Sequence, residues 1–495
     1  MSASPLRPGG PLLLCLLCAL AAAAAAPAGE RGEWQQQRQQ HRPKPPPGAD
    51  NLPHPTSAGY VDVDANHGSS IYYQYYEADS VHPRDTTPIV LWLQGGPGCS
   101  SLFGTFYLNG PFALSVDGVL RTNPGRWNRR YGMLFIDQPI GTGFSRAGSQ
   151  AIPREELTLA AHLYTALQGF YRAHPAFAAR PLYITGESYA GKYAPSIAHY
   201  IIQAAAQAAG TAGKLHRRRA LPDDVEPPAF RLGGVAIGNG FTDAVAQTLV
   251  QAEVAFNMGL LDSRQRAEAE AMQTEVVELV RNRNWVKARR ASDALLGYIT
   301  NSSATATLED IRRDKAYDAE DRVSAYLNRA EVKANVGAPA DIVYAACSKE
   351  VDAAMGHDVM KSVAGLVPDI LASSHLMLYQ GQFDAECGVA SNEAWISRLS
   401  WPGHTGFWNA ERTFWRDPEF GDRVLGFVKS HARLSHVVIR NAGHMVPHDR
   451  PVVSQRMIEA FVESVEAGSE VFDPAAARRG APARSAPSGA RIAAA

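Results

Sequence analysis

Three residues of this chain have the types and the order of a nucleophilic catalytic site. Ser188 stands in the stretch Gly-Glu-Ser-Tyr-Ala, Asp384 ends a long apolar segment, and His444 lies in a loop after another apolar segment. A serine hydroxyl is a weak nucleophile until a base takes its proton, and the base needs a carboxylate that fixes its tautomer. We therefore assign Ser188 as the nucleophile, His444 as general base and then acid, and Asp384 as the residue that orients the histidine.

The residues around Ser188 predict a sharp turn between a buried strand, Leu182 to Ile184, and a helix, Lys192 to Tyr200. Such a turn needs small neighbours, and Gly186 supplies one, while Ala190 stands where a second glycine is usual. Taken alone, the motif is more often a helix N-terminus with a serine near its cap. Together with the order serine, aspartate, histidine, it resembles the nucleophile elbow of α/β-hydrolases.

A glycine-rich loop after the apolar strand Pro88 to Leu93 predicts a second part of the site. A tight turn would account for two of its glycines. The functional interpretation is an oxyanion hole, in which this loop adds an N–H donor to that of the residue after the nucleophile. That interpretation pairs the amides of Gly96 and Tyr189. The loop lacks the lysine of a phosphate-binding P-loop.

Four separate motifs resemble the signatures of the serine carboxypeptidase family, and they occur in the family's order. The resemblance extends over about Gly59 to Phe461 and is strongest toward the vitellogenic carboxypeptidase-like branch and its plant relatives. The motifs are W-L-Q-G-G-P-G-C-S-S from Trp92, D-Q-P-x-G-x-G-F-S from Asp137, G-E-S-Y-A-G from Gly186 and G-H-M-V-P-x-D-x-P from Gly443.

The resemblance implies a site for the terminal carboxylate of a peptide, at the positions of Trp92, Gln94, Gly95 and Glu187. An acidic residue fits an anion site only when it is protonated, because a neutral carboxylic acid can donate a hydrogen bond. Such a site favours acidic pH. The helix that begins after Ser188 would act in the opposite direction, since its dipole lowers the pKa of a carboxylate at its start.

The chain departs from the family's pattern at Leu108, where the family has a second glutamate that shares a proton with the equivalent of Glu187. The leucine removes a like charge but adds an apolar wall, so the sequence leaves the net effect on carboxylate binding open. Gln94 also replaces the more usual asparagine, as in related branches. Met445, beside the base, is expected to face the leaving residue.

Three cysteines remain after removal of the predicted signal: Cys99, Cys347 and Cys387. The family resemblance implies a disulfide between Cys99 and Cys347. Cys387 would then be a free thiol near Asp384, in the substrate pocket, and would make the enzyme sensitive to mercurials. The alternative for Cys387 is a small buried apolar residue.

The apolar pattern predicts an α/β fold, an α/β-hydrolase with a mainly parallel sheet and an inserted helical cap at about 243–367. Asn301 begins a glycosylation sequon in a polar loop of this cap. The expected elements outside the cap are strands at 60–64, 71–76, 88–93, 133–136, 182–184, 232–237, 376–379 and 436–439, with helices at 157–172 and 453–466. Those expected in the cap are helices at 244–258, 263–283, 285–299 and 317–328.

Both ends of the chain are expected to lie outside the 59–467 domain. Residues 1–28 have the charge, the apolar run and the cleavage site of a secretory signal. Residues 29–58 are too polar to bury a core and are expected to be a disordered lead or propeptide, and 468–495 a disordered tail. Arg217 to Arg219 form a weak candidate for proteolytic processing.

The leading hypothesis is a secretory-pathway serine carboxypeptidase, acting through an acyl-enzyme on peptides with a free C-terminus, without metal or cofactor. An acyltransferase on the same scaffold is the alternative, and a catalytically inert binding protein is a third. A net charge of -1 gives no reason to expect nucleic acid as a partner, and no later segment is long and apolar enough to span a membrane. Monomer or homodimer, and vacuole or lysosome against secretion, stay open.

Overall fold

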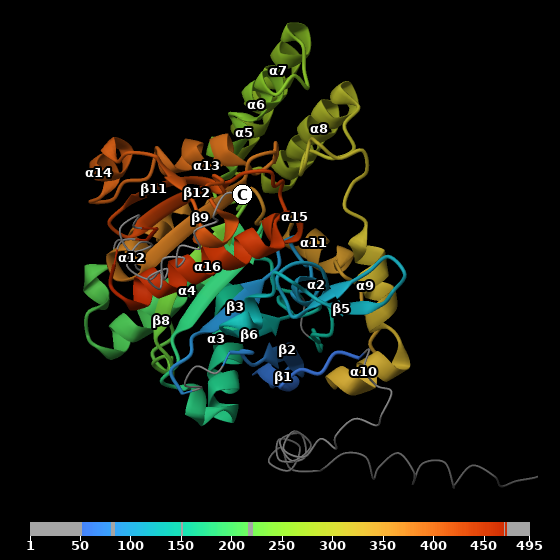
Figure 1. Cartoon of the computed structure of the whole chain (residues 1–495), viewed down its shortest axis with the longest axis vertical. Helices are drawn as coiled ribbons and strands as arrows, with labels where there is room; N and C mark the ends of the chain where they lie inside the picture. Colours follow the sequence, from blue (N-terminus) through green and yellow to red (C-terminus); the bar gives the residue numbers. More distant parts are fainter. Residues whose placement is uncertain (1–51, 81–84, 150–151, 216–220, 470, 473–495) are drawn as a thin grey trace, which may run out of the picture. The chain divides into compact units, whose positions relative to one another are not determined.

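The computed structural model describes residues 52–80, 85–149, 152–215, 221–469 and 471–472. Its centre is a ten-stranded sheet with the order β1-β2-β6-β3-β7-β8-β9-β12-β11-β10 (Figure 1). The strands are β1 Ser57–Asp64, β2 Ser69–Tyr76, β3 Ile89–Leu93, β6 Gly132–Ile136, β7 Leu182–Glu187, β8 Leu232–Gly238, β9 His375–Gly381, β10 Thr413–Trp415, β11 Gly426–His431 and β12 Leu434–Ile439.

The six central strands, β6, β3, β7, β8, β9 and β12, pair in parallel, whereas the outer strands pair antiparallel. This arrangement confirms the predicted α/β fold with a mainly parallel sheet. The central strands are almost wholly buried because helices cover both faces, which is why apolar residues dominate them, most completely in β3 and β6. A separate hairpin, β4 Phe112–Leu114 with β5 Leu120–Thr122, was not predicted.

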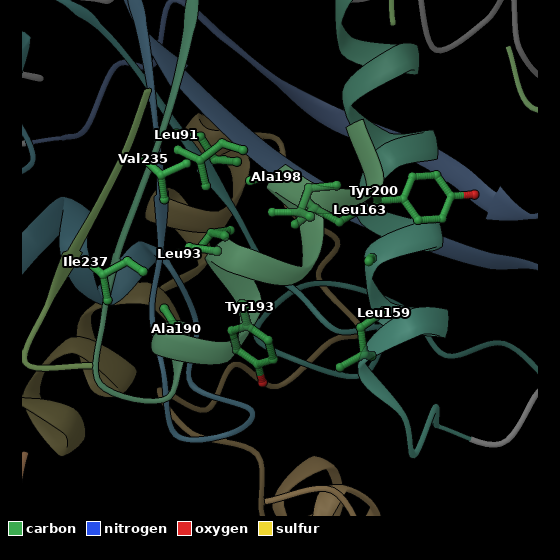
Figure 2. Packing of buried hydrophobic residues seen from close by; sticks show 14 of the residues in the cluster. Leu91, Leu93, Leu159, Leu163, Ala190, Tyr193, Ala198, Tyr200, Val235 and Ile237 are labelled. Carbon is green, nitrogen blue, oxygen red and sulfur yellow. The ribbon is translucent and has the colours of Figure 1, made fainter. Parts of the chain in front are cut away.

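Successive residues of each strand pack into two different apolar layers. In β3, Leu91 and Leu93 face the layer of α3 (Glu156–Ala173) and α4 (Ala190–Ala208), whereas Trp92 faces that of α2 (Leu102–Tyr107) and α16 (Pro451–Glu466). Figure 2 shows the first layer, where β3 and β8 side chains lie against Ala190 and Tyr193 of α4. Because successive side chains of a strand point to opposite faces of the sheet, each face has its own apolar core.

The regular elements between β8 and β9 are all helices, as predicted for the cap, with irregular stretches at 304–318 and 337–348. The helices α6, α7 and α8 extend away from the sheet (Figure 1). The predicted helix at 244–258 is instead two, and Asn301 lies in the last turn of α8, exposed, and not in a loop. The cap helices are α5 Ala244–Thr248, α6 Gln251–Asn257, α7 Ser263–Arg281, α8 Trp285–Ser303, α9 Ala319–Leu327, α10 Ala330–Val336 and α11 Lys349–Met355.

The remaining helices complete the layers around the C-terminal half of the sheet. They are α12 Val367–Ser373, α13 Val389–Ile396, α14 His404–Asn409 and α15 Val446–Asp449. In the part of the chain that the structure describes, no helix is both long and apolar enough to cross a bilayer.

The described residues reach slightly beyond the predicted domain at both ends. Pro53 and Pro55 are buried and β1 begins at Ser57, while Val471 is buried after α16 and the ring of Phe472 packs on Trp415. The predicted signal at 1–28 and the basic run Arg217 to Arg219 lie outside the described residues, as does most of the predicted tail.

A disulfide between Cys99 and Cys347 ties the glycine-rich loop to the end of the cap, as the family resemblance implied. The backbone reinforces the link, since Ser100 N–H donates to Ala346 O at 2.7 Å and Ser348 N–H donates to Gly98 O at 2.8 Å. The bond closes a span of 248 residues, so breaking it enlarges the conformational freedom of the unfolded chain considerably.

Replacing Cys99 and Cys347 together by serine is expected to lower the free energy of unfolding by about 2–5 kcal/mol. Urea unfolding of the double variant and of the wild-type protein, with and without reductant, measures this. A Cys387→Ala variant, which keeps the disulfide, is the matched control. A double variant as stable as oxidised wild type would contradict the expectation.

Candidate active site

Ser188 occupies a strained turn between β7 and α4. Its φ of 65° lies in the left-handed region, which a residue with a side chain rarely adopts. A Cβ on Gly186 would come within 2.6 Å of the Cβ of Ala190, so the small residue predicted before the turn is required there. Glu187 and Tyr189 are buried, whereas Ser188 is partly exposed. The predicted strand, turn and helix around Ser188 are present, and the serine at the turn is partly exposed.

Asp384 and His444 meet at the carboxyl ends of β9 and β12. His444 Nδ1 and Asp384 Oδ2 are 2.8 Å apart, and Asn239 Nδ2 donates to the same carboxylate oxygen at 2.7 Å. The other oxygen, Oδ1, accepts from the backbone N–H groups of Glu386 and Cys387 at 2.7 and 3.0 Å. The carboxylate is thus fixed by four donors and holds the proton of the imidazole on Nδ1.

The environment of His444 favours its protonated form. Burial alone would lower the pKa of the imidazole, but Asp384, with further contributions from Glu309 and Glu187, raises that pKa well above its usual value. The site therefore stabilises the imidazolium that forms when a serine hydroxyl gives up its proton.

Residues 308–311 of the cap, which we call the strap, run between the two loops that carry Asp384 and His444. Ala385 N–H donates to Leu308 O at 2.8 Å, and His444 N–H donates to Glu309 O at 2.7 Å. A Cβ on Gly443 would meet the Cβ of Asp310 at 2.4 Å, so the strap lies in close contact with the histidine loop. The strap was not predicted, because these backbone contacts leave no signal in the residue types.

The glycine-rich loop lies directly against the nucleophile. A Cβ on Gly95 would come within 2.4 Å of the backbone nitrogen of Tyr189 and 2.8 Å of the Ser188 Cβ. Gly96 is exposed and has a φ of 108°, which only glycine adopts easily. Among the described backbone groups, none accepts a hydrogen bond from the N–H of Gly96 or of Tyr189. The two amides predicted to form the oxyanion hole thus lie beside Ser188 as unused donors.

Trp92, Gln94 and Glu187 form a buried chain of hydrogen bonds. Trp92 Nε1–H donates to Gln94 Oε1 at 3.1 Å, and Gln94 Nε2 donates to Glu187 Oε1 at 3.2 Å. Glu187 Oε2 is buried and has no partner among the described residues. Burial raises the pKa of Glu187 to about 8, although His444 and Gln94 both act to lower it. Desolvation therefore outweighs these two effects. The sequence left open whether the pKa of Glu187 is raised or lowered, and the structure indicates that it is raised.

Leu108 contributes to the apolar surroundings of the hydrogen-bonded residues Trp92, Gln94 and Glu187. It is buried at the end of α2, in the apolar layer that contains Trp92. A leucine there supplies no charge that could share a proton with Glu187, so desolvation, with smaller contributions from Glu309 and Asp449, raises the pKa of this carboxyl.

A buried lysine behind the nucleophile supports Tyr189. Lys192 Nζ donates to Asp358 Oδ2 at 2.7 Å and to Tyr189 Oη at 3.1 Å, and all three side chains are buried. The contacts hold the residue that carries one predicted oxyanion donor. The sequence indicated only that Lys192 begins a helix, because its partner Asp358 is distant in the chain.

The two remaining predicted site residues are mostly buried. Cys387 is free, as predicted, but burial and the neighbouring Glu386 and Asp384 raise the pKa of its thiol well above the usual value. Since the thiolate is the reactive form, this burial favours the alternative of a small buried residue, and the mercurial sensitivity stays a prediction. Met445 is also buried, in the same apolar layer as Trp92.

This geometry defines a class of protein. The sheet is mainly parallel, and a strained serine follows β7 near its middle. A histidine and an aspartate that contact each other follow β12 and β9. These are the features of a serine hydrolase with the α/β-hydrolase fold.

Comparison with known proteins narrows the class. The family described as serine carboxypeptidase matches residues 46–464. Serine carboxypeptidase-like 50 of Arabidopsis thaliana is 41% identical over 82% of this chain and 87% of its own length. A probable serine carboxypeptidase, CPVL, of Dictyostelium discoideum is 32% identical over 83% of this chain and 79% of its own. The chain belongs to the serine carboxypeptidase family and is an enzyme of the serine-type carboxypeptidase class.

A solved structure agrees with this fold. The chain is similar to the crystal structure of Kex1ΔP, a prohormone-processing carboxypeptidase from Saccharomyces cerevisiae, with a TM-score of 0.70. The match covers 86% of this chain and 95% of the other at 23% identity.

Proposed function

We propose that this enzyme releases the C-terminal amino acid of peptides through an acyl-enzyme on Ser188, at acidic to neutral pH. The observation that carries the proposal is Glu187: a buried carboxyl beside the nucleophile, with a raised pKa and one oxygen that has no partner among the described residues. When protonated, this group donates a hydrogen bond to a substrate carboxylate. Gln94 and Gly95 lie next to it, and Trp92 fixes the Gln94 amide.

The proposed reaction has two steps. Ser188 Oγ attacks the last peptide carbonyl and transfers its proton to His444, while the N–H groups of Gly96 and Tyr189 stabilise the negative charge on the carbonyl oxygen. The C–N bond then breaks as His444 gives that proton to the leaving amine, which leaves the acyl group on the serine. Water, deprotonated by His444, hydrolyses the ester and restores the enzyme.

A matched pair of substrates tests the proposal. One is a blocked dipeptide with a free C-terminal carboxylate, and the other is its C-terminal amide. We expect purified protein to hydrolyse the free acid faster at about pH 6, where Glu187 is protonated, and Ser188→Ala to hydrolyse neither. Equal rates on acid and amide would contradict a carboxylate site.

Acyl transfer to an alcohol is the second proposal for the same acyl-enzyme. Leu108 favours it, because a buried apolar residue replaces the second glutamate of the carboxylate site. A fluorophosphonate that labels Ser188, together with no cleavage of either dipeptide, would support acyl transfer. Absence of labelling in folded protein would contradict both activities and leave a binding role.

We also propose that the protein enters the secretory pathway, toward the vacuole or lysosome or the exterior, with glycosylation at Asn301. The signal-like start, the disulfide and the exposure of Asn301 support this.

A further inference from the structure

A cavity of about 280 Å³ lies beside the loop that carries Asp384, between that loop and α6 of the cap. We call it the acidic pocket. Its apolar lining includes Val250, Val254 and Met258, and its polar lining includes Gln251, Glu386 and Glu393.

The polar groups of the acidic pocket offer acceptors. Gln251 is buried, and its Oε1 has no hydrogen-bond partner among the described residues. Glu386 is half-buried, and no described group forms an ion pair or hydrogen bond with its carboxylate. Glu393 is exposed, and among the described residues its carboxylate has one distant ion-pair neighbour, His436 Nδ1 at 3.8 Å. A buried acceptor without a donor, such as Gln251 Oε1, is costly, and together with the two carboxylates it suits a ligand that carries hydrogen-bond donors and a positive charge.

The position of the pocket in the sheet indicates which part of a substrate reaches it. Ser188 follows β7. On one side of β7, β3 leads into the loop of Gln94 and Gly96, where the proposed function places the terminal carboxylate. On the other side, β8 and β9 lead to Gln251 and Glu386. A peptide carbonyl at Ser188 therefore directs its acyl part toward β8 and β9.

We propose that the acidic pocket binds the cationic side chain of a lysine or arginine that supplies the acyl group, which is the penultimate residue of the substrate. The ammonium or guanidinium group donates to Glu386 and to Gln251 Oε1, and the aliphatic stem packs on the apolar wall formed by Val250, Val254 and Met258. This inference rests on the proposed acyl-enzyme at Ser188, and it adds the substrate class.

The charge state of Glu386 makes the preference depend on pH. Burial raises the pKa of Glu386 to about 7; His444 and Arg289 act to lower it, while Glu309 and Asp384 act to raise it. The carboxylate is therefore neutral at low pH and ionised above about 7, where it attracts a cation more strongly. We expect the preference for a basic residue to increase as the pH rises from about 5 to about 8.

Nitrophenyl esters of Nα-blocked lysine and norleucine test the pocket alone, because these acyl donors have no terminal carboxylate. The readout is the ratio of kcat/KM for lysine over norleucine at about pH 7.5. We expect wild type to favour lysine and Glu386→Gln to lower the ratio about tenfold, as for loss of one charge-assisted hydrogen bond. Gln251→Met lowers it independently. Glu411→Gln, an exposed site, keeps the wild-type ratio.

The outcomes separate this inference from the proposed function. A lysine preference that Glu386→Gln reduces, without cleavage of free-acid dipeptides, supports the pocket and overturns the carboxypeptidase proposal. Cleavage of free-acid dipeptides with equal ester rates overturns the pocket alone, as does a ratio that both Glu386→Gln and Gln251→Met leave unchanged. If Glu386→Gln fails to fold, Gln251→Met decides. Absence of acylation by either ester overturns both.

Discussion

Replacing Asp384 by asparagine lowers kcat about 10⁴-fold in our expectation, with the fold retained. The reason lies in the four donors that surround this carboxylate. Oδ1 accepts two backbone N–H groups, whereas Oδ2 accepts from Asn239 and from His444 Nδ1. In the variant, the asparagine NH₂ replaces either Oδ1 or Oδ2. At both positions this donor would face two other donors instead of being able to accept from them.

The conflict in the Asp384→Asn variant is most easily relieved at His444, because an imidazole can move its proton to Nε2 and a backbone amide has no such freedom. A histidine protonated on Nε2 cannot accept the proton of the Ser188 hydroxyl. The nucleophile then stays inactive although every atom of the site remains near its place, which is why the loss is expected in kcat.

Steady-state kinetics and the rate of fluorophosphonate labelling at Ser188 measure the effect of Asp384→Asn. Both rates fall, because both need the serine deprotonated. Asp314→Asn, an exposed site, is the matched control, and thermal unfolding verifies that both variants fold. A kcat within about tenfold of wild type would show that Asp384 does not set the tautomer of His444.

Local patterns in the sequence predicted the centre of the fold, and they identified the turn at Ser188. β3, β6 and the first half of β7 are apolar runs because they are covered on both faces, and a run of this kind indicates a buried strand. The elbow at Ser188 was predictable since its strain demands small neighbours at fixed offsets, and those neighbours are part of the motif.

The strands β10 and β11, at one edge of the sheet, are only weakly indicated by the sequence. β10 has three residues, and β11 carries Lys429 and Gly426 in a strand that is only partly buried. Neither reaches the length or apolar content that identifies a strand, and both owe their conformation to pairing with β12 and with each other. Their absence from the prediction reflects tertiary pairing that outweighs local propensity.

The strap, Lys192 and the acidic pocket share a different cause. Each depends on segments distant in the chain: Leu308 contacts Ala385, Lys192 contacts Asp358, and Gln251 lines the same cavity as Glu386. The types of these residues are ordinary for a helix or a loop. Only the fold gives them a role, so sequence reasoning about single segments could not identify them.

Glu187 and His444 have opposite requirements in the proposed reaction. Glu187 must be protonated to bind a carboxylate, and His444 must be neutral to accept a proton from Ser188. Each group affects the pKa of the other. The active form of the pair therefore holds one proton on Glu187 besides the Nδ1 proton of the imidazole, and the pair titrates in two steps. Activity on a free-acid peptide should follow a bell-shaped pH profile.

Replacing Glu187 by glutamine is expected to remove the alkaline limb of that profile. Above about pH 8, wild type loses its donor and repels the substrate carboxylate, so kcat/KM for the free acid falls toward about tenfold per pH unit. In the variant, the glutamine oxygen still accepts from Gln94, and its NH₂ takes the place of Oε2, so the donor persists at every pH. The variant should exceed wild type at about pH 9 and approach it at about pH 6.

Stability should change together with activity in the Glu187→Gln variant. In wild type the folded carboxyl titrates at about 8 and the unfolded one near 4.5, so the folded state binds the extra proton between these values. Wild-type stability therefore falls by up to about 1.4 kcal/mol for each pH unit across this window, and Glu187→Gln removes that slope. Urea unfolding at several pH values measures this slope.

The amide dipeptide and Glu187→Leu, which lacks a donor, are the controls for the kinetic experiment on Glu187→Gln. An alkaline limb that persists in Glu187→Gln would assign the titration to another group and remove the support for a protonated carboxyl in the carboxylate site.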